Sequence, residues 1–379
     1  MAYEVTFGEN SPAGYALNSA KGGQQAKLRV SEFISSEDGD LFISRLEGMP
    51  QSFLAMLPPE SQIPPSSIDH LVAIIRPNRT GTIYVNELDL TIRMRSRRAV
   101  KAGERVFHDD ILDIERMQFK GVTFPADAGV VVLISVGWRK GLYYDLNPVS
   151  VDPQRRQYDV EMTMGQFYSY LLFQDLFKIS QADWKVLFSQ KWFPFIYLGQ
   201  PLLKKMISYV RSGWNVDDLL DKISDETKRL LRESPDIWKK NPYAQEHIEI
   251  FEKAVDRYLN DDFISACSIL FPRIEGLMRS YRKSAGIIQR PSGANLAKAV
   301  VAKDEASRHG ASYLLPEHFR EYLEAVYFKN FDDAAPSDLS RHSLAHGVVP
   351  MGEFTLKGAT IGFLILYQLA LFLRSEPKT

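Results

Sequence analysis

The sequence predicts an α+β protein with more than one domain. Apolar and polar residues alternate in the first 147 positions, whereas after about residue 160 apolar residues recur every three or four positions. With 379 residues, 45% of them apolar, the chain is long enough for two or three domains with cores of their own. We expect a mainly antiparallel β domain at 1–147, a helical connector at 148–240 and an all-α helical bundle at 241–379.

Strands are expected throughout the first domain. The strictest alternation lies at 88–95, which would place apolar side chains on one sheet face and charges on the other. Further strands are predicted at 27–34, 41–46, 70–75, 111–119 and 130–136, with Gly, Pro, Asn and Asp between them. The aromatic residues of 137–144 are typical of a strand end that covers a β core rather than of a ligand cage.

Helices follow a segment rich in Pro, Asp and Arg at 148–157, which marks the first boundary. They are expected at 162–178, 181–190, 201–211, 216–231 (capped by Asn215), 243–259, 261–283, 294–302 and from Pro316 onward. Pro272 would kink the helix at 261–283. Ser337 is the expected cap of a short helix that Gly347 ends, and an apolar helix is expected at 353–375.

Composition limits the classes of function. A net charge of −1 and a pI near 6.7 exclude a chain that coats nucleic acid by overall charge. The single cysteine, Cys267, allows neither a disulfide nor a cysteine-based metal site, which fits a reducing cytoplasm. No secretory signal is expected at the N-terminus. The apolar run at 361–373 is shorter than the roughly 20 residues of a membrane helix, so we expect a buried helix there.

Basic residues gather near the strand at 88–95. Arg93, Arg95, Arg97 and Arg98 are accompanied by Lys101 and Arg105, with Glu104 as the one acid of the segment 93–105. Such a segment could hold a phosphate backbone. The alternative, which we favour, is an exposed edge whose charges prevent pairing with other chains, because no interleaved aromatic residues are present for base stacking.

The strongest candidate for chemistry is the stretch Arg341-His342-Ser343-Leu344-Ala345-His346-Gly347. The guanidinium of Arg341 can hold two phosphate oxygens and stabilise the charge that develops during phosphodiester cleavage. Histidine side chains in general have a pKa near 6.5, so the imidazole of His346 could take a proton from a ribose 2′-hydroxyl or give one to the departing 5′-oxygen. This pair suits RNA, which carries its own nucleophile, and needs no metal or other cofactor.

The directions of the side chains on a helix leave more than one interpretation of this stretch open. Five helical positions correspond to about 500°, so Arg341 and His346 would point about 140° apart on an ideal helix. They converge only if the turn unwinds near Gly347 or if a second copy of the chain completes the site. His342 and His346 share a helix face and have zinc-ligand spacing, with Glu353 as a third ligand, although we do not expect a metal. The structural alternative is that Arg341 only holds helix-end carbonyls or a carboxylate.

The final part of the chain resembles the HEPN superfamily, whose helical bundles carry an Arg, four to six residues and then a His. The stretch 341–347 fits this pattern with a four-residue gap, two long expected helices precede it, and an apolar helix follows it. The run Phe271-Pro272-Arg273-Ile274-Glu275-Gly276-Leu277-Met278-Arg279 is similar to the second helix of several such domains. The resemblance covers the predicted bundle at 241–379 and not the residues before it.

This resemblance implies a metal-independent endoribonuclease that acts as a homodimer, with the Arg and His pairs of two copies facing each other. Arg341 would position the phosphate, His346 would be the acid or base, and His342 would form hydrogen bonds nearby. Glu275 is expected to orient Arg341 from the second long helix. The implied role is in toxin systems or phage defence by abortive infection, with an antitoxin or a phage-derived trigger as a further partner.

Two functions therefore remain at the level of sequence. In the first, the C-terminal bundle cuts RNA while the β domain senses a trigger or selects the substrate. In the second, the bundle is not catalytic and only dimerises or binds nucleotide or nucleic acid. The presence of both Arg341 and His346 favours the first, and the lack of an overall basic charge favours the second.

Overall fold

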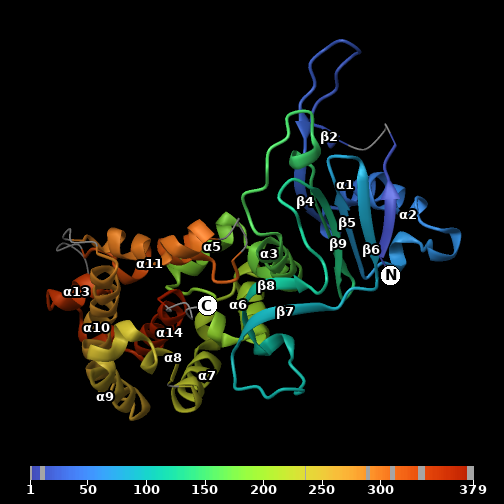
Figure 1. The fold of residues 1–379 in the computed structure, drawn as a ribbon. Helices are drawn as coiled ribbons and strands as arrows, with labels where there is room; N and C mark the ends of the chain where they lie inside the picture. The colour runs from blue at the N-terminus through green and yellow to red at the C-terminus, as the bar shows by residue number, and fades with distance from the viewer. Residues whose placement is uncertain are drawn as a thin grey trace. The chain divides into compact units, whose positions relative to one another are not determined.

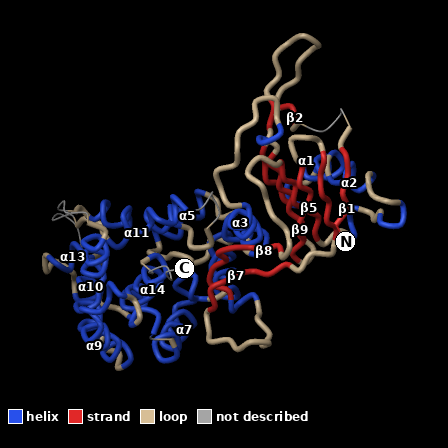
Figure 2. The backbone as a smooth tube through the Cα atoms, in the orientation of Figure 1, coloured by secondary structure: helices blue, strands red, loops and turns tan. Residues whose placement is uncertain are grey.

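The chain has an antiparallel β-sheet region followed by a helical region, as expected for an α+β protein (Figures 1 and 2). A computed structural model describes residues 2–8, 13–234, 236–286, 291–307, 312–331 and 338–373. Internal contacts divide the chain into two compact units. The first unit, here called the β unit, comprises residues 1–94 and 114–174, and the second, the helical unit, comprises residues 95–113 and 175–379.

A six-stranded sheet forms the centre of the β unit. Its strand order is β1-β6-β5-β9-β10-β4, and all neighbouring strands are antiparallel. The strands are β1 (Ala2–Thr6), β4 (Ser31–Ser35), β5 (His70–Ile75), β6 (Thr80–Val85), β9 (Gly129–Val136) and β10 (Arg139–Asp145). Every residue of β5 is buried, because apolar layers cover both faces of the sheet.

Helices cover the two faces of this sheet. One layer includes Phe42 of α1 (Asp40–Gly48) and Phe53 of α2 (Pro50–Ala55). The other includes Met164 of α3 (Val160–Leu172), which packs with apolar residues of β5 and β9. Short strands β2 (Tyr15–Ala16) and β3 (Leu28–Arg29) pair separately from the sheet.

A two-stranded ribbon of β7 (Leu90–Ser96) and β8 (Ile111–Phe119) is also separate from the main sheet. The division between the two units falls within this ribbon, so that its distal part, residues 95–113, belongs to the helical unit. The strand with the strictest alternation in the sequence is therefore not a strand of the main sheet.

The helical unit is built around α14 (Leu356–Phe372), which is buried from Ala359 to its end. Close packing needs a residue without a side chain at Gly362, where an added Cβ would lie 2.7 Å from Leu270 Cδ2 of α10. The other helices are α5 (Gln181–Ser189), α6 (Gln200–Arg211), α7 (Leu220–Glu233), α8 (Asp236–Lys239), α9 (Ile248–Leu259), α10 (Phe263–Ser284), α11 (Gly293–Ser307), α12 (Pro316–Tyr322) and α13 (Arg341–Ala345). A π-helical turn, Leu323–Tyr327, continues α12, and α4 (Gln174–Phe177) follows α3.

Polar groups of α14 find internal partners, as burial requires. The Gln368 side chain accepts a hydrogen bond from the backbone N–H of Ile196 (3.3 Å) and donates one to the carbonyl of Leu314 (3.3 Å). Tyr367 donates to the carbonyl of Leu230 at 2.9 Å. These bonds attach residues 196–230 to the C-terminal helix. No helix within the described ranges is long and apolar enough to cross a membrane.

Most expected helices are present, and one expected strand is wrong. Asn215 caps the turn that leads into α7, Pro316 begins α12, and Pro272 lies inside α10. Residues 41–46 form part of α1 instead of a strand, because so short an apolar-rich stretch also fits a helix whose Phe42 faces the core. Strands β1 and β6 were not expected, whereas the strand end expected at 137–144 overlaps β10. The residues of the expected connector, 148–240, are shared between the two units.

Candidate active site

The Arg-x4-His stretch forms the short helix α13, which begins at Arg341 and has His346 as its C-cap. Ser340, not Ser337, is the N-cap, and its hydroxyl accepts a hydrogen bond from the backbone N–H of Ser343 (3.1 Å). Ser337 lies outside the described residues. Gly347 ends the helix with a φ of 70°, a conformation that glycine adopts without strain.

Two buried hydroxyls hold α13 in place. Ser343 donates to the carbonyl of Asp338 at 2.6 Å and accepts from the backbone N–H of Ser340 at 2.9 Å. Ser340 in turn donates to the carbonyl of Lys329 at 2.8 Å. The first turn of α13 is therefore tied to the chain on its N-terminal side by side chains that water does not reach.

A charged network continues from this anchor. The ammonium of Lys191 lies 2.8 Å from Asp338 and 3.1 Å from Glu353, and Lys329 also pairs with Asp338. These partners lower the pKa of Asp338 against the opposing effect of burial, so the carboxyl is ionised at neutral pH. The network joins the segment before α6 to both sides of α13. Sequence reasoning missed it because these residues are far apart in the chain.

Arg341 pairs with Glu275 of α10, the residue expected to orient it. The Glu275 side chain is only 5% exposed, and its other oxygen accepts from Arg279 Nε at 2.6 Å. The contact with Glu275 is made through Arg341 Nε. Within the described part of the chain, the two terminal nitrogens of Arg341 have no hydrogen-bond partner, so they are available to an anion.

His346 is exposed at the C-terminal end of α13. Its ring lies 4.9 Å from that of Phe331, measured between ring centres, at an angle of 51°. Arg341 is directed to α10 by Glu275, whereas His346 packs on the segment before α13. The structure therefore does not unwind the helix to bring Arg341 and His346 together within one chain.

His342 lies one turn before His346 and is half-buried beside Phe328, at 6.1 Å between ring centres. Burial lowers the pKa of His342, and the charges of Arg341 and His346 lower it further. The imidazole is therefore neutral at pH 7 and can both donate and accept a hydrogen bond.

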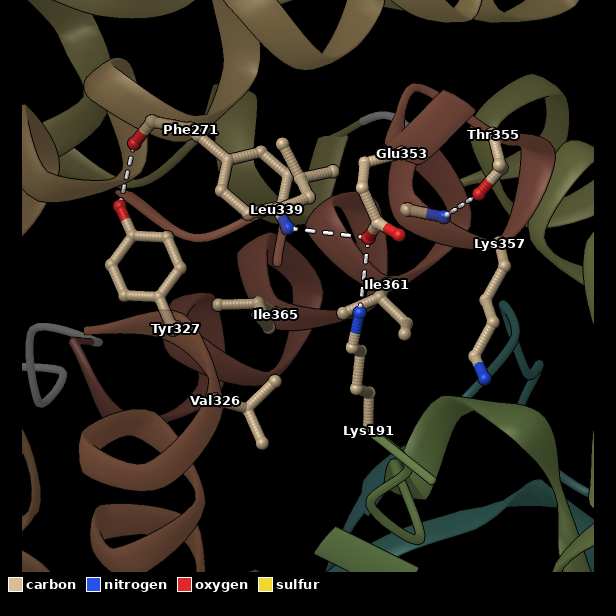
Figure 3. Close-up of a pocket in the computed structure, with 11 residues that line it drawn as sticks. Lys191, Phe271, Val326, Tyr327, Leu339, Glu353, Thr355, Lys357, Ile361 and Ile365 are labelled. Carbon is tan, nitrogen blue, oxygen red and sulfur yellow. Dashed lines mark hydrogen bonds and ion pairs between the residues drawn. The ribbon is translucent and has the colours of Figure 1, made fainter. Parts of the chain in front are cut away.

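A small pocket is lined in part by Lys191 and Glu353, which form an ion pair (Figure 3). Glu353 accepts from the backbone N–H of Leu339 (3.3 Å) and from Lys191, while Phe271 and Ile365 form apolar walls. The space is about 40 Å³, which suits a few water molecules rather than an RNA nucleotide. We therefore place the candidate site on the outer face of α13.

The zinc alternative does not receive its third ligand from Glu353. That carboxylate is engaged by Lys191 and by the backbone of Leu339. Over the ranges that the structure describes, no group of three or more His, Cys, Asp or Glu side chains could hold a metal ion.

The four arginines of the β7 region have different environments. Arg97 is largely buried and contacts Glu226 and the carbonyl of Tyr197 (2.5 Å). Arg98 binds both oxygens of Asp110, at 2.8 and 2.9 Å, and also pairs with Glu104. Arg95 is half-buried and Arg93 is exposed. Arg97 and Arg98 already have carboxylate partners, which weakens the alternative in which they hold a phosphate backbone.

Comparison with other proteins gives no family for this chain. No protein-family model matches it, and neither does any curated protein or solved structure with which it was compared. Its function must therefore be inferred from the residues of the site.

Proposed function

We propose that this protein is a HEPN-like, metal-independent endoribonuclease with Arg341 and His346 as its catalytic residues. The observation that carries the proposal is the placement of both side chains on one short helix whose outer face is open. Glu275 fixes Arg341 through Nε and leaves the terminal nitrogens available, while His346 is exposed. The proposed biological role is as a toxin or an effector of phage defence by abortive infection in the cytoplasm.

Each residue has a defined task in the proposed reaction. The ribose 2′-oxygen attacks the adjacent phosphorus and the bond to the 5′-oxygen breaks, which yields a 2′,3′-cyclic phosphate and a 5′-hydroxyl end. The guanidinium of Arg341 binds the non-bridging oxygens, where negative charge increases in the transition state. His346 removes the 2′-hydroxyl proton, or as imidazolium protonates the leaving 5′-oxygen. One histidine per chain performs one of these transfers, so two copies would supply both.

A homodimer therefore follows from the proposed chemistry. Exposed apolar side chains close to His346 in the chain, Val348 and Met351, support an interface at this end of α13. Across a two-fold axis, each Arg341 and His346 would lie near those of the partner copy. Such an arrangement offsets the divergence of the two side chains within one chain.

The second candidate is a non-catalytic protein that dimerises or binds nucleotide or nucleic acid. The pairing of Arg341 with Glu275 favours it, since an arginine held by a buried carboxylate also serves to join two helices. In that case α13 is an element of structure, and removal of His346 leaves RNA binding and stability unchanged.

The deciding experiment is incubation of the full chain with total RNA in EDTA. We expect fragments with 2′,3′-cyclic phosphate ends, and their loss in Arg341→Ala and in His346→Ala. His108→Ala is the matched control, because His108 is exposed and lies outside α13. Cleavage that persists in both site variants, or that stops only with chelator, would disprove the assignment.

The dimer is tested separately. Mass measurement in solution at micromolar concentration should give twice the chain mass of 43.2 kDa. Mixing the inactive Arg341→Ala and His346→Ala proteins should restore part of the activity, because a mixed dimer retains one arginine and one histidine. A strict monomer that still cuts RNA would remove the need for a composite site.

A further inference from the structure

Arg282, in the last turn of α10, is a buried cation to which the described residues supply no counter-ion. The residue is only 7% exposed. Its Nε and Nη1 atoms are buried and have no hydrogen-bond partner among the residues that the structure describes. No carboxylate within those residues forms an ion pair with it.

This is unusual for arginine, which keeps its charge at every physiological pH and is costly to bury without a partner. Elsewhere the chain satisfies a buried arginine fully. Arg156 of the β unit, whose side chain is 2% exposed, lies against Asp145 and donates to the carbonyls of Pro125 and Ala128. The contrast indicates that Arg282 is arranged for an anion that is not part of the described chain.

Helix geometry places Arg282 on the same face of α10 as Glu275. Seven residues correspond to about 700°, almost two full turns, and to a rise of about 10 Å. Glu275 pairs with Arg341, the first residue of α13. Arg282 therefore lies two turns further along α10 from the point where α10 meets Arg341.

The chain beyond α10 returns to the same region. An added Cβ at Gly293 would lie 2.7 Å from the ring of Phe328, and that ring neighbours His342. Gly293 thus packs against Phe328, the aromatic neighbour of His342.

Positive charges outnumber negative ones among Glu275 and the arginines near it. Arg279, Arg282 and Arg341 contribute three guanidinium groups, and Glu275 is the carboxylate that two of them share. The planar arginine fork binds the two non-bridging oxygens of a phosphodiester well, because two of its N–H groups can donate to the two oxygens at once and the bonds are charge-assisted.

We propose that Arg282 is a phosphate-binding residue, which with Arg279 holds a phosphate of the RNA chain flanking the one at Arg341. The identity of the ligand as RNA rests on the proposed function, whereas the anion site itself rests on the unpartnered guanidinium. Arg282 would set the path of the substrate along α10 and would not take part in proton transfer.

The first arm of the test uses inorganic phosphate as the probe. Melting temperatures are compared in phosphate and in chloride at equal ionic strength for the wild type, Arg282→Met and Arg273→Met. Arg273 is the matched control, since it is exposed and lies nine residues, about 900°, from Arg282 on the opposite face of α10. We expect the phosphate-dependent increase in melting temperature to be lost only in Arg282→Met. An equal increase in all three proteins would overturn the anion site.

Folding is an informative readout here as well. Because no residue that the structure describes partners Arg282, Arg282→Met should fold and should melt in chloride at a temperature at least equal to that of the wild type. A variant that fails to fold would show that the arginine has an internal counter-ion, which overturns the proposal. Arg282→Lys, which retains the charge but not the fork, should recover only part of the phosphate effect.

The second arm measures binding of a labelled single-stranded RNA by fluorescence anisotropy, in the His346→Ala background so that the RNA stays intact. We expect Arg282→Met to weaken binding about tenfold and to reduce the slope of log affinity against log salt by about one phosphate contact. Cleavage by the wild type with an unchanged slope in Arg282→Met would overturn the RNA subsite and leave the proposed function standing. A phosphate effect that depends on Arg282, in a protein that neither binds nor cuts RNA, would support the anion site and overturn the nuclease.

Discussion

The carboxylate of Glu275, in the middle of α10, pairs with the guanidinium of Arg341, the first residue of α13. The same carboxylate accepts a hydrogen bond from Arg279, so one buried negative charge faces two positive ones. This arrangement fixes the direction of Arg341 and leaves an excess of positive charge beside it. An arginine oriented in this way loses less conformational entropy when it binds a phosphate.

Replacement of Glu275 by Gln tests this orientation. The variant keeps the shape of the side chain but removes the counter-ion of Arg279 and Arg341. We expect the free energy of unfolding in urea to fall by about 1–3 kcal/mol, because both arginines are partly exposed and can regain some hydration. RNA cleavage should fall mainly through kcat, since Arg341 is less firmly placed. Glu249→Gln, an exposed change on α9, should alter neither quantity. Wild-type kinetics in Glu275→Gln would refute a positioning role.

The anchor of α13 gives a second prediction. Ser343→Ala removes the donor to the Asp338 carbonyl and the acceptor for the Ser340 N–H, and leaves both groups buried. We expect a loss of about 1–3 kcal/mol in unfolding free energy. Ser284→Ala is a useful comparison, because its hydroxyl also donates to a carbonyl, that of Tyr281, but at an exposed position. Equal effects of the two changes would show that burial of the serine bonds is unimportant.

The role of Gly347 in ending α13 can be tested by a substitution that affects only the backbone conformation. Gly347 has a φ of 70°, and an added Cβ there would meet nothing within 4 Å. Gly347→Ala should therefore cost about 1–2 kcal/mol from the left-handed conformation and nothing from collisions. Gly352→Ala is the control, since that position is equally open but lacks a positive φ. Thermal melts that rank the two variants the other way would contradict this account of the C-cap.

Acid should destabilise the β unit through His70. Burial lowers the pKa of His70, and its Nε2 accepts a hydrogen bond from the backbone N–H of Leu88 at 2.9 Å. A lowered folded-state pKa means that the unfolded chain binds more protons near pH 6. The contribution of His70 is then complete above its unfolded pKa of about 6.5, and is lost as pH falls through the lower folded value.

The measurement for His70 is unfolding free energy in urea from pH 7.5 to 5. Each unit of pKa depression contributes about 1.4 kcal/mol to the loss. His70→Gln keeps an acceptor without a titrating ring, so its stability should depend less on pH over this range. His108→Gln, at an exposed position, should retain the wild-type pH dependence. Identical pH profiles for all three proteins would show that His70 titrates normally.

The helices of the C-terminal region could be predicted because each has a local signal. Asn215 caps the turn before α7, and apolar residues recur at helical spacing along α9 and α10. The strand at 70–75 was equally clear, since a short, continuous apolar run suits a strand buried on both faces. Residues 41–46 had no such clear signal, because a six-residue run satisfies both periods until its packing partners are known.

The candidate site was only partly visible in the sequence. Arg341, His342 and His346 are adjacent in the chain, and Glu275 was identified from the resemblance of its helix. Lys191 and Asp338 were not, because ion pairs between distant segments leave no periodic pattern. Composition also does not show which charged side chains are already paired, as Arg97 and Arg98 illustrate.

Arg93 and Arg97, four residues apart, lead to opposite predictions. Arg97 is held by Glu226 and by the Tyr197 carbonyl, so Arg97→Met should lower the unfolding free energy by about 2 kcal/mol without changing the salt dependence of RNA binding. Arg93 is exposed, so Arg93→Glu should leave stability within about 0.5 kcal/mol of wild type. RNA affinity in Arg93→Glu then reports on the surface itself. A decrease that becomes smaller at high salt would identify a phosphate contact, whereas unchanged affinity would assign Arg93 to protection of the strand edge.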